Sequence, residues 1–340
     1  MTRLLINAQA PSGHGIDRYA REIVSNLRAK TTETIDVLRH ERDGRSRREE
    51  LGGIFRLNQA LLGNYEVVHS LYLGFPMVKR ARRRVLTIHD VIFLDHPQHF
   101  SGLARRYMQQ SFARQIAWAT DIVFISEHAR RRTSEHFDVR STHTHVIHHG
   151  CTPRSAQPTS FTPRLLQLGL DHRPFLFYVG TFKPWKNVPR MLEAFSQLTR
   201  EFPDARLVLA GNPAANDDRE TVLALARKLG SSVIIAGPVT QQELDVLYRH
   251  ALSLVFPSIV EGLGLPILEA QSAGTNCITS RDSAMSEVAP HNALLVDPLS
   301  SEEIAQAMRT VLKQPKKRPE IKYSMQWPEV IDRYRSVYGI

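Results

Sequence analysis

The sequence predicts an α/β protein, because short apolar runs alternate with amphipathic helical patterns along its whole length. Its 340 residues are too many for one ordinary α/β unit and suit two domains. Two such series follow one another, with a proline- and serine-rich stretch at 152–163 between them. These observations predict two Rossmann-like domains, each with a parallel sheet that helices cover on both faces.

The strand candidates divide evenly between the two halves of the chain. Those in the first half are Arg3–Ile6, Ile35–Leu38, Val67–Ser70, Val85–Ile88, Ile122–Ile125 and His145–Ile147. Those in the second half are Phe175–Val179, Arg206–Ala210, Val233–Ala236, Ser253–Phe256, Cys277–Thr279 and Ala293–Val296. The helical patterns between them include Ile16–Leu27, Leu103–Ala119, Pro189–Arg200, Arg219–Leu229, Gln241–His250 and Ser301–Leu312.

Two joints divide the chain into three parts. We expect an N-terminal, acceptor-binding domain at 1–165 and a C-terminal, nucleotide-sugar-binding domain at 166–318. The last part, 319–340, follows a second proline-containing joint at 314–320 and carries a separate helical pattern. We expect this last helix to cross back to the N-terminal domain.

The composition favours a globular cytoplasmic protein. Hydrophobic residues make up 42% of the chain, which supplies a large core and argues against disorder. The two cysteines, Cys151 and Cys277, provide neither a disulfide framework nor a zinc-ligand spacing, as suits a reducing compartment. The N-terminus has the pattern of a first β-strand and not of a signal peptide, and no apolar run approaches the roughly 20 residues of a membrane helix.

The net charge of +10 lies in one half of the chain. Residues 1–165 contain 25 Lys and Arg against 15 Asp and Glu, which gives 25 − 15 = +10, and the remainder contains 19 of each. This asymmetry indicates an anionic partner for the first half, although each basic cluster alone is typical of a solvated face. A nucleic-acid-binding protein is disfavoured, because the clusters lack interleaved aromatic residues and a recognised module.

The segment from Glu261 to Glu269, which reads EGLGLPILE, carries the main functional signal. It follows the strand candidate Ser253–Phe256, and Pro266 suits the first turn of a helix. Glu261 then lies in a glycine-containing loop at the carboxyl end of a strand, where ligands of parallel sheets bind. The glycines allow close backbone approach, and the helix N-terminus offers N–H groups to phosphates. A nucleotide sugar suits such a site, since its hydroxyls can donate to the two carboxylates. The alternative is an ordinary strand–loop–helix corner without a ligand, in which a glutamate in the first helical turn is favourable to the helix dipole.

This nine-residue string resembles the E-x7-E signature of the large retaining family of GT-B glycosyltransferases (glycosyltransferase group 1), which includes many bacterial mannosyltransferases. The resemblance covers almost the whole chain. The other similar segments are Gly13–Tyr19, Thr87–Asp90, Ile125–Glu127 with Arg130 and Arg131, Val179–Asn187, Ser286–Val288 and Leu295–Pro298.

The resemblance implies a GT-B fold, in which two Rossmann-like domains face a central cleft. It also implies retaining, metal-independent transfer of a hexose from a nucleotide sugar, without a cofactor. The implied catalytic residues are His89, Lys186 and Glu261. The implied donor-binding residues are Gly13, Gly15, Gly180, Thr181, Lys186, Gly211, Val239, Glu261, Gly262, Leu263, Gly264, Leu265 and Glu269. The implied acceptor-binding residues are Arg18 and Asp90, and no metal ligand is expected.

The sequence departs from the family pattern near the expected diphosphate site. Trp185 stands where arginine is usual and Lys183 where an acidic residue is usual, which removes an expected phosphate contact. Asp17, Leu263 and Asn276 replace the common glycine, phenylalanine and proline. Lys186 remains, and we expect it to reach the diphosphate from a position just before a helix whose N-cap is Asn187.

The histidines of 143–149 are the sequence's best alternative signal. Strand alternation places His143 and His145 on one face, but no carboxylate or cysteine ligand set accompanies them in the sequence. No Asp-x-Asp motif occurs anywhere in the chain either. We therefore expect no metal site.

The V-G-T and E-G-L-G-L-P segments look most like those of family members that transfer mannose from GDP-mannose in surface polysaccharide assembly. The resemblance therefore implies GDP-mannose as the donor and, as the acceptor, a glycan or a lipid-diphosphate-linked sugar of surface polysaccharide or lipopolysaccharide synthesis. The basic first half would then contact anionic lipid at the cytoplasmic face of the inner membrane. Three alternatives stay open: a transferase using a UDP- or dTDP-sugar, a nucleotide-sugar epimerase or hydrolase, and a non-catalytic nucleotide-sugar-binding protein.

Overall fold

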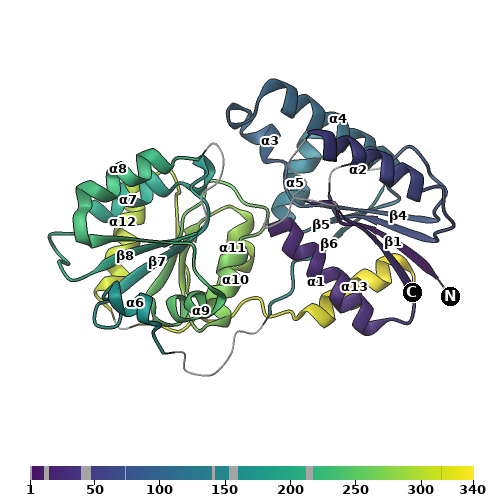
Figure 1. The fold of residues 1–340 in the computed structure, drawn as a ribbon. Helices are drawn as coiled ribbons and strands as arrows, with labels where there is room; N and C mark the ends of the chain where they lie inside the picture. The colour runs from purple at the N-terminus through teal and green to yellow at the C-terminus, as the bar shows by residue number, and fades with distance from the viewer. Residues whose placement is uncertain are drawn as a thin grey trace. The chain divides into compact units, whose positions relative to one another are not determined.

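Two units, each built on a six-stranded parallel sheet, make up the chain (Figure 1). The computed structural model describes residues 2–10, 15–39, 47–72, 74–139, 142–152, 160–211, 217–314 and 316–340. The N-terminal unit combines Met1–Gly150 with Met325–Ile340, and the C-terminal unit is Cys151–Ser324. The predicted α/β class with two parallel sheets is confirmed.

The units divide at Gly150 and Met325 rather than at the expected residues 165 and 319. Arg164 already belongs to the C-terminal unit, because its guanidinium pairs with Glu243 at 3.1 Å. Lys316 and Lys322 also belong there, since their ammonium groups donate to the carbonyl oxygens of Arg249 and Ser286. These contacts join residues far apart in the sequence, so local composition could not reveal them.

The N-terminal unit orders its strands β2-β1-β3-β4-β5-β6. The strands are β1 (Arg3–Asn7), β2 (Thr34–Leu38), β3 (Val67–Ser70), β4 (Arg83–Ile88), β5 (Asp121–Phe124) and β6 (His143–Val146). The helices are α1 (Gly15–Lys30), α2 (Arg47–Ala60), α3 (Ile92–Asp95), the 3-10 turn η1 (Pro97–His99), α4 (Gly102–Trp118), α5 (Glu127–His136) and α13 (Trp327–Tyr338).

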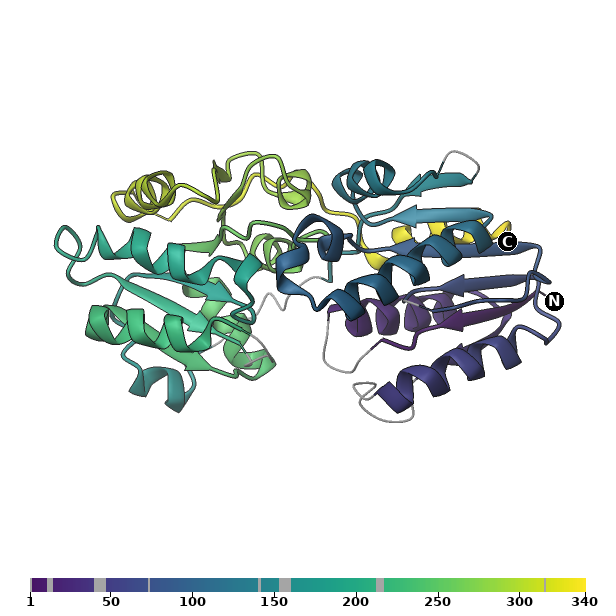
Figure 2. The same cartoon turned by 90° about the horizontal axis from the view of Figure 1, so that it is seen from above.

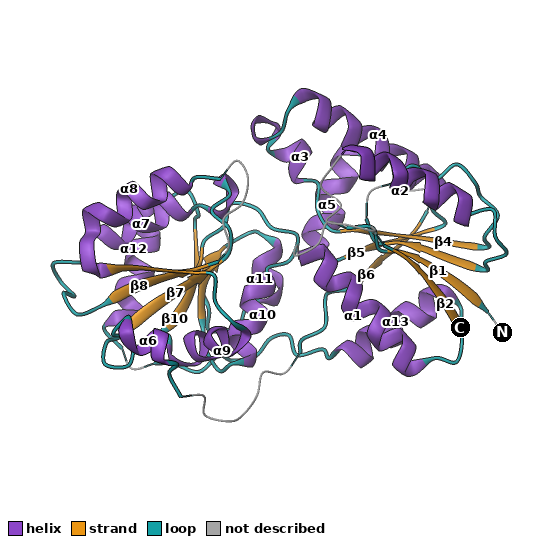
Figure 3. Cartoon of the chain, in the orientation of Figure 1, coloured by secondary structure: helices purple, strands orange, loops and turns teal. Residues whose placement is uncertain are grey.

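Alternation along each strand sends side chains to two separate cores. Leu4 and Ile6 face the core that α1 and α13 complete, whereas Leu5 faces the core on the opposite side of the sheet. Helices therefore cover both faces, as Figure 3 shows for each unit.

Helix α13 is the last element of the chain and packs beside α1 (Figure 2). Val330, Ile331 and Tyr334 are fully buried in this core. The hydroxyl groups of Tyr334 and Tyr19 are hydrogen-bonded, and the Lys30 ammonium meets the Asp332 carboxylate at 2.6 Å. Without α13, the apolar face of α1 would meet water.

The C-terminal unit orders its strands β12-β11-β10-β7-β8-β9. The strands are β7 (Phe175–Val179), β8 (Arg206–Ala210), β9 (Val233–Gly237), β10 (Ser253–Phe256), β11 (Cys277–Ser280) and β12 (Leu294–Val296). The helices are α6 (Pro163–Gln167), α7 (Val188–Ser196), α8 (Arg219–Leu229), α9 (Gln241–His250), α10 (Leu265–Ser272), α11 (Ala284–Val288) and α12 (Ser301–Leu312), with 3-10 turns η2 (Pro184–Lys186) and η3 (Gly230–Ser232).

Strand order creates a switch point in this unit. From β7 the chain proceeds outward through β8 and β9, and from β10 it proceeds outward in the opposite direction through β11 and β12. The loops that leave β7 and β10 therefore start side by side at the switch point, the usual ligand position in open parallel sheets.

Candidate functional site

The loops after β7 and β10 bring Lys186 and Glu261 together at this switch point. The Lys186 ammonium donates to the Glu261 carboxylate at 2.5 Å, and the two side chains are 18% and 14% exposed. The same ammonium lies 5.1 Å from the centre of the Phe256 ring at the end of β10. An ion pair this shielded from water holds both side chains in a fixed position.

Asn187 joins the two loops. Its backbone is left-handed, with φ +62°, and its side-chain amide donates to the carbonyl oxygens of Pro257 at 3.0 Å and Pro298 at 2.6 Å. The Ile259 amide donates to the Trp185 carbonyl at 2.7 Å, so Trp185 contributes a backbone link here. Asn187 occupies the expected N-cap position of α7, but its side chain makes no capping bond, and its side-chain oxygen accepts from the Arg190 guanidinium at 2.8 Å instead.

Glycines end three adjacent strands beside this ion pair. Gly180 and Gly211 follow β7 and β8 with φ of +154° and +142°, and Gly237 ends β9 with φ +63°. A Cβ on Gly211 would lie 2.0 Å from the Gly180 carbonyl oxygen, so only glycine fits there. Sequence reasoning named Gly180 and Gly211 but missed Gly237, although all three follow an apolar strand in the same way.

Two other predicted donor contacts lie at the same sheet edge. Thr181 follows Gly180, and its carbonyl accepts from the Tyr178 hydroxyl at 2.6 Å. Val239 is partly buried between Gly237 and the N-cap Thr240 of α9. Since β8 separates β9 from β7, Val239 lies two strands away from the strand that precedes Lys186.

Helix α10 begins directly after the Glu261 loop. Gly264 is its N-cap, with φ +101°, and proline occupies its first turn. Glu269, one turn further on, accepts from the Tyr248 hydroxyl at 2.8 Å. Gly262 and Leu265 are partly buried, whereas the Leu263 side chain is only 2% exposed. Any contact from Leu263 to a ligand would therefore have to come from its backbone.

In the N-terminal unit, His89 lies at the carboxyl end of β4. Its ring is buried and donates through Nε2 to the Leu71 carbonyl at 3.1 Å. Burial lowers the pKa of His89 to about 4, so the ring is neutral at pH 7 and its Nδ1 is a hydrogen-bond acceptor. Asp90 follows, and its carboxylate accepts from the Ile92 amide at 3.1 Å.

The other residues expected in this unit lie at the start of α1. Gly15 is the first residue of that helix, and Arg18 is exposed on its first turn. Gly13 lies outside the described residues. The edge of the ring of Tyr19, one residue after Arg18, faces the His89 ring at a centroid distance of 5.0 Å, so α1 begins beside His89.

A buried hydrogen-bond network behind His89 was not expected from the sequence. His69 of β3 bonds to the Tyr338 hydroxyl at 2.6 Å and to the Thr87 hydroxyl at 2.7 Å. Burial, with a smaller effect of His89, lowers the pKa of His69 to about 3. The available signal was a single polar histidine inside the apolar run of β3.

The histidines of β6 do meet a carboxylate, contrary to the sequence-based expectation. His145 Nε2 and His143 Nδ1 lie 3.2 Å and 3.7 Å from the same Asp121 oxygen, because β5 and β6 pair in register. Across the residues that the structure describes, no group of three or more His, Cys, Asp or Glu side chains is arranged to hold a metal ion.

Two family sequence models match the chain side by side. The model described as Glycosyltransferase Family 4 matches residues 2–154, and the model described as Glycosyl transferases group 1 matches residues 167–326. The second match contains the Lys186 and Glu261 loops, and the first contains His89.

Several curated relatives are glycosyltransferases. The O-antigen chain mannosyltransferase B of Escherichia coli is 27% identical over 321 residues, which cover 84% of this chain and 83% of the relative. The D-inositol 3-phosphate glycosyltransferase of Corynebacterium aurimucosum is 27% identical over 289 residues, covering 77% and 66%. The serotype-specific mannosyltransferase WbdA of Escherichia coli is 25% identical over 251 residues, covering 72% and 31%.

Solved structures share the fold. HepE of Anabaena, crystallised with UDP and glucose, superposes with a TM-score of 0.72 at 16% identity and full coverage of both chains. Sucrose-phosphate synthase of Thermosynechococcus elongatus gives a TM-score of 0.74 at 18% identity, with 99% and 95% coverage.

Among the described residues, no helix has the length and apolar character needed to cross a bilayer.

Proposed function

This chain belongs to the GT-B glycosyltransferases, and we propose that it is a retaining, metal-independent enzyme that moves a hexose from a nucleotide sugar to a glycan or lipid-linked acceptor. The observation that carries the proposal is the Lys186–Glu261 ion pair at the switch point of the C-terminal sheet. Glycines flank this pair on the neighbouring strand ends, where a diphosphate can approach the backbone.

In the proposed mechanism, the donor's diphosphate leaves as negative charge builds on it. Lys186 and the N-terminus of α10 stabilise this charge, the largest help that a preorganised site can give. Glu261 accepts from hydroxyls of the transferring sugar, and Glu269 accepts from ribose hydroxyls. The acceptor hydroxyl attacks from the side that the diphosphate leaves, and the phosphate takes its proton, so no side-chain nucleophile is needed.

The N-terminal unit contributes groups for the sugars. His89 is neutral, and its Nδ1 can accept from a hydroxyl of the transferring sugar. Asp90 and Arg18 are assigned to the acceptor, and Gly15 to the donor diphosphate. Each of these roles is part of the proposal.

We assign GDP-mannose as the donor and surface polysaccharide or lipopolysaccharide as the product. Support comes from two E. coli relatives named as O-antigen and serotype-specific mannosyltransferases. A UDP- or dTDP-sugar is the alternative, since HepE was crystallised with UDP. We place the enzyme at the cytoplasmic face of the inner membrane, where its basic first half would meet anionic lipid.

A donor panel tests this function. The purified protein is incubated with GDP-mannose, UDP-glucose and a dTDP-hexose, each with a membrane-lipid and glycan extract and with EDTA present. Nucleotide release from GDP-mannose, with an α-linked product seen by NMR, supports the full proposal. Nucleotide release from another donor would replace GDP-mannose in the proposal. Formation of an epimerised free nucleotide sugar favours an epimerase. No turnover with any donor contradicts the proposal that the chain is an enzyme.

A further inference from the structure

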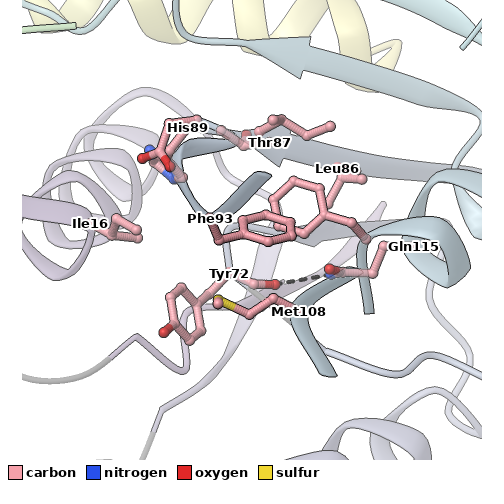
Figure 4. Close-up of a pocket in the computed structure, with 11 residues that line it drawn as sticks. Ile16, Tyr72, Leu86, Thr87, His89, Phe93, Met108 and Gln115 are labelled. Carbon is pink, nitrogen blue, oxygen red and sulfur yellow. Dashed lines mark hydrogen bonds between the residues drawn. The ribbon is translucent and has the colours of Figure 1, made fainter. Parts of the chain in front are cut away.

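A cavity of about 170 Å³ lies within the N-terminal unit, between the end of β4 and helices α3 and α4 (Figure 4). Its wall is mostly apolar, and the rings of Phe93 and Phe112 meet there at a centroid distance of 5.1 Å. Met108 of α4 completes this wall. Nothing in the donor chemistry described above uses these side chains.

The cavity has one polar side. His89 and Asp90 line it together with the apolar residues, and Figure 4 shows His89 and the polar Gln115 on opposite sides of the Phe93 ring. The Gln115 amide group donates to Ser70 and to the Tyr72 carbonyl, both at 3.0 Å, and so serves the protein's own structure. Asp90, which is partly exposed and which the proposed function assigns to the acceptor, is the polar residue of this wall that we place against the acceptor sugar.

The cavity is partly open to the surface, and Tyr72, Asp90, Met108 and Phe112 in its lining are each partly exposed. Its volume is close to the roughly 150 Å³ of an apolar protein cavity that accepts benzene. One six-membered ring or a short branched alkyl group is thus the largest group that would fill it.

We propose that this cavity binds a compact apolar group, of the size of a phenyl ring, attached to the acceptor sugar, while the Asp90 carboxylate accepts from a hydroxyl of that sugar. The inference rests on the proposed function, because it names the class of acceptor that the transferase takes. The sugar ring lies at the polar side, and the apolar group enters between Met108, Phe93 and Phe112. Removing a phenyl ring from water in this way strengthens binding by about tenfold or more.

Binding of two matched glycosides tests the inference without any donor. The probes are phenyl α-D-mannopyranoside and methyl α-D-mannopyranoside, and their dissociation constants are measured by NMR titration. We expect the wild-type protein to bind the phenyl glycoside at least about tenfold more tightly. A ratio near one, or no binding of either glycoside, overturns the inference.

Two variants test whether the preference for the phenyl glycoside arises in the cavity. Met108→Trp fills it from the partly exposed side, so the ratio should fall to within about twofold of one. Leu103→Trp introduces the same side chain on the same helix at a position that is 85% exposed, and should keep the wild-type ratio. If Met108→Trp does not fold, Phe93→Leu, which removes one aromatic wall, should lower the ratio instead. A wild-type ratio in every folded cavity variant contradicts the assignment.

The donor reaction is measured separately, as nucleotide release without glycoside. Failure of glycoside discrimination with intact nucleotide release overturns only this inference. Failure of nucleotide release with intact discrimination overturns the proposed function, and the cavity is then a binding site for apolar glycosides but not the acceptor site of a transferase.

Discussion

At the scale of single residues, Lys186 and Glu261 depend on each other. Their side chains are mostly shielded from water, so removal of one leaves the other's charge without its partner. In the proposed reaction the leaving diphosphate takes the place of the glutamate as the anion nearest to the lysine. The ion pair therefore holds the two side chains in place before the donor binds, and it has to loosen when the diphosphate reaches the lysine.

Replacing the lysine tests this role. We expect Lys186→Ala to lower the rate of nucleotide release about 100-fold or more, because it removes a preorganised positive charge from the leaving group. Lys228→Ala, at an exposed position of α8, is the matched control and should keep the wild-type rate. A Lys186→Ala rate within about twofold of wild type would show that this lysine does not act on the donor.

Gly211 gives a structural prediction at the same scale. A methyl group there would meet the Gly180 carbonyl at 2.0 Å in a backbone conformation that favours glycine. We expect Gly211→Ala to lower the free energy of unfolding of the C-terminal unit by about 2–4 kcal/mol, measured by urea titration. Gly102→Ala, where a Cβ meets nothing within 4 Å, should change stability by about 1 kcal/mol at most, and equal effects would contradict the account.

The residue types of the site could be predicted from the sequence, but their pairing could not. Lys186 and Glu261 each follow a strand in a loop that resembles a family motif, which is a local signal. Their contact depends on β7 lying next to β10, and strand order is a tertiary property. His69 and the Asp121 contacts of β6 were missed for the same reason.

At the scale of elements, the predicted strands all appear, and their ends differ from the predicted ends by at most two residues. The apolar runs are short and bounded, so they identify strands well, whereas β6 begins at His143 because its pairing with β5 extends over polar residues. Helix α7 ends at Ser196, before the expected Arg200. The boundaries between the two units differ from the predicted ones, because contacts between segments that are distant in the sequence fix them.

Helix α13 carries the prediction at this scale. Ile331 is fully buried against α1, so we expect Ile331→Ala to lower the free energy of unfolding of the N-terminal unit by about 2–5 kcal/mol. Arg333→Ala, two residues on and exposed, should change it by less than about 0.5 kcal/mol. Tryptophan fluorescence follows mainly this unit, since Trp118 and Trp327 belong to it and Trp185 belongs to the other unit. Equal stability of both variants would mean that α13 is not part of the unit's core.

At the scale of the whole molecule, the buried histidines make the N-terminal unit sensitive to acid. Burial holds the pKa of His69 at about 3 and that of His89 at about 4, against about 6.5 in the unfolded chain. Below pH 6.5 the unfolded chain therefore takes up protons that the folded unit does not. We expect these two residues to lower its free energy of unfolding by about 3–4 kcal/mol from pH 7 to pH 5, and buried His149, whose pKa burial also lowers, adds to this loss.

Urea unfolding at the two pH values measures this loss. His89→Gln should remove part of the pH dependence, because it removes one of the buried histidines that take up a proton in the unfolded chain. His172→Gln, at an exposed position, should keep the wild-type dependence. Stability that does not change between pH 7 and pH 5 would contradict the buried, neutral state of both rings.

The uneven charge gives a second prediction for the whole molecule. The excess of ten positive charges lies in the first half of the chain, so we expect vesicles that contain anionic lipid to retain the protein at low salt. Retention should be lost at about 1 M salt, where screening removes the attraction. No retention by these vesicles at low salt, measured by co-sedimentation, would exclude the membrane contact.

The central claim is that the loop after β10 holds the sugar of a nucleotide-sugar donor, and Glu261→Gln tests it most directly. Nucleotide release from the best donor of the panel is compared between wild type, Glu261→Gln and Glu193→Gln, whose glutamate is exposed on α7. We expect Glu261→Gln to lose about 100-fold or more in rate and Glu193→Gln to match the wild type. Equal rates in all three folded proteins would contradict the assignment of this loop to the donor.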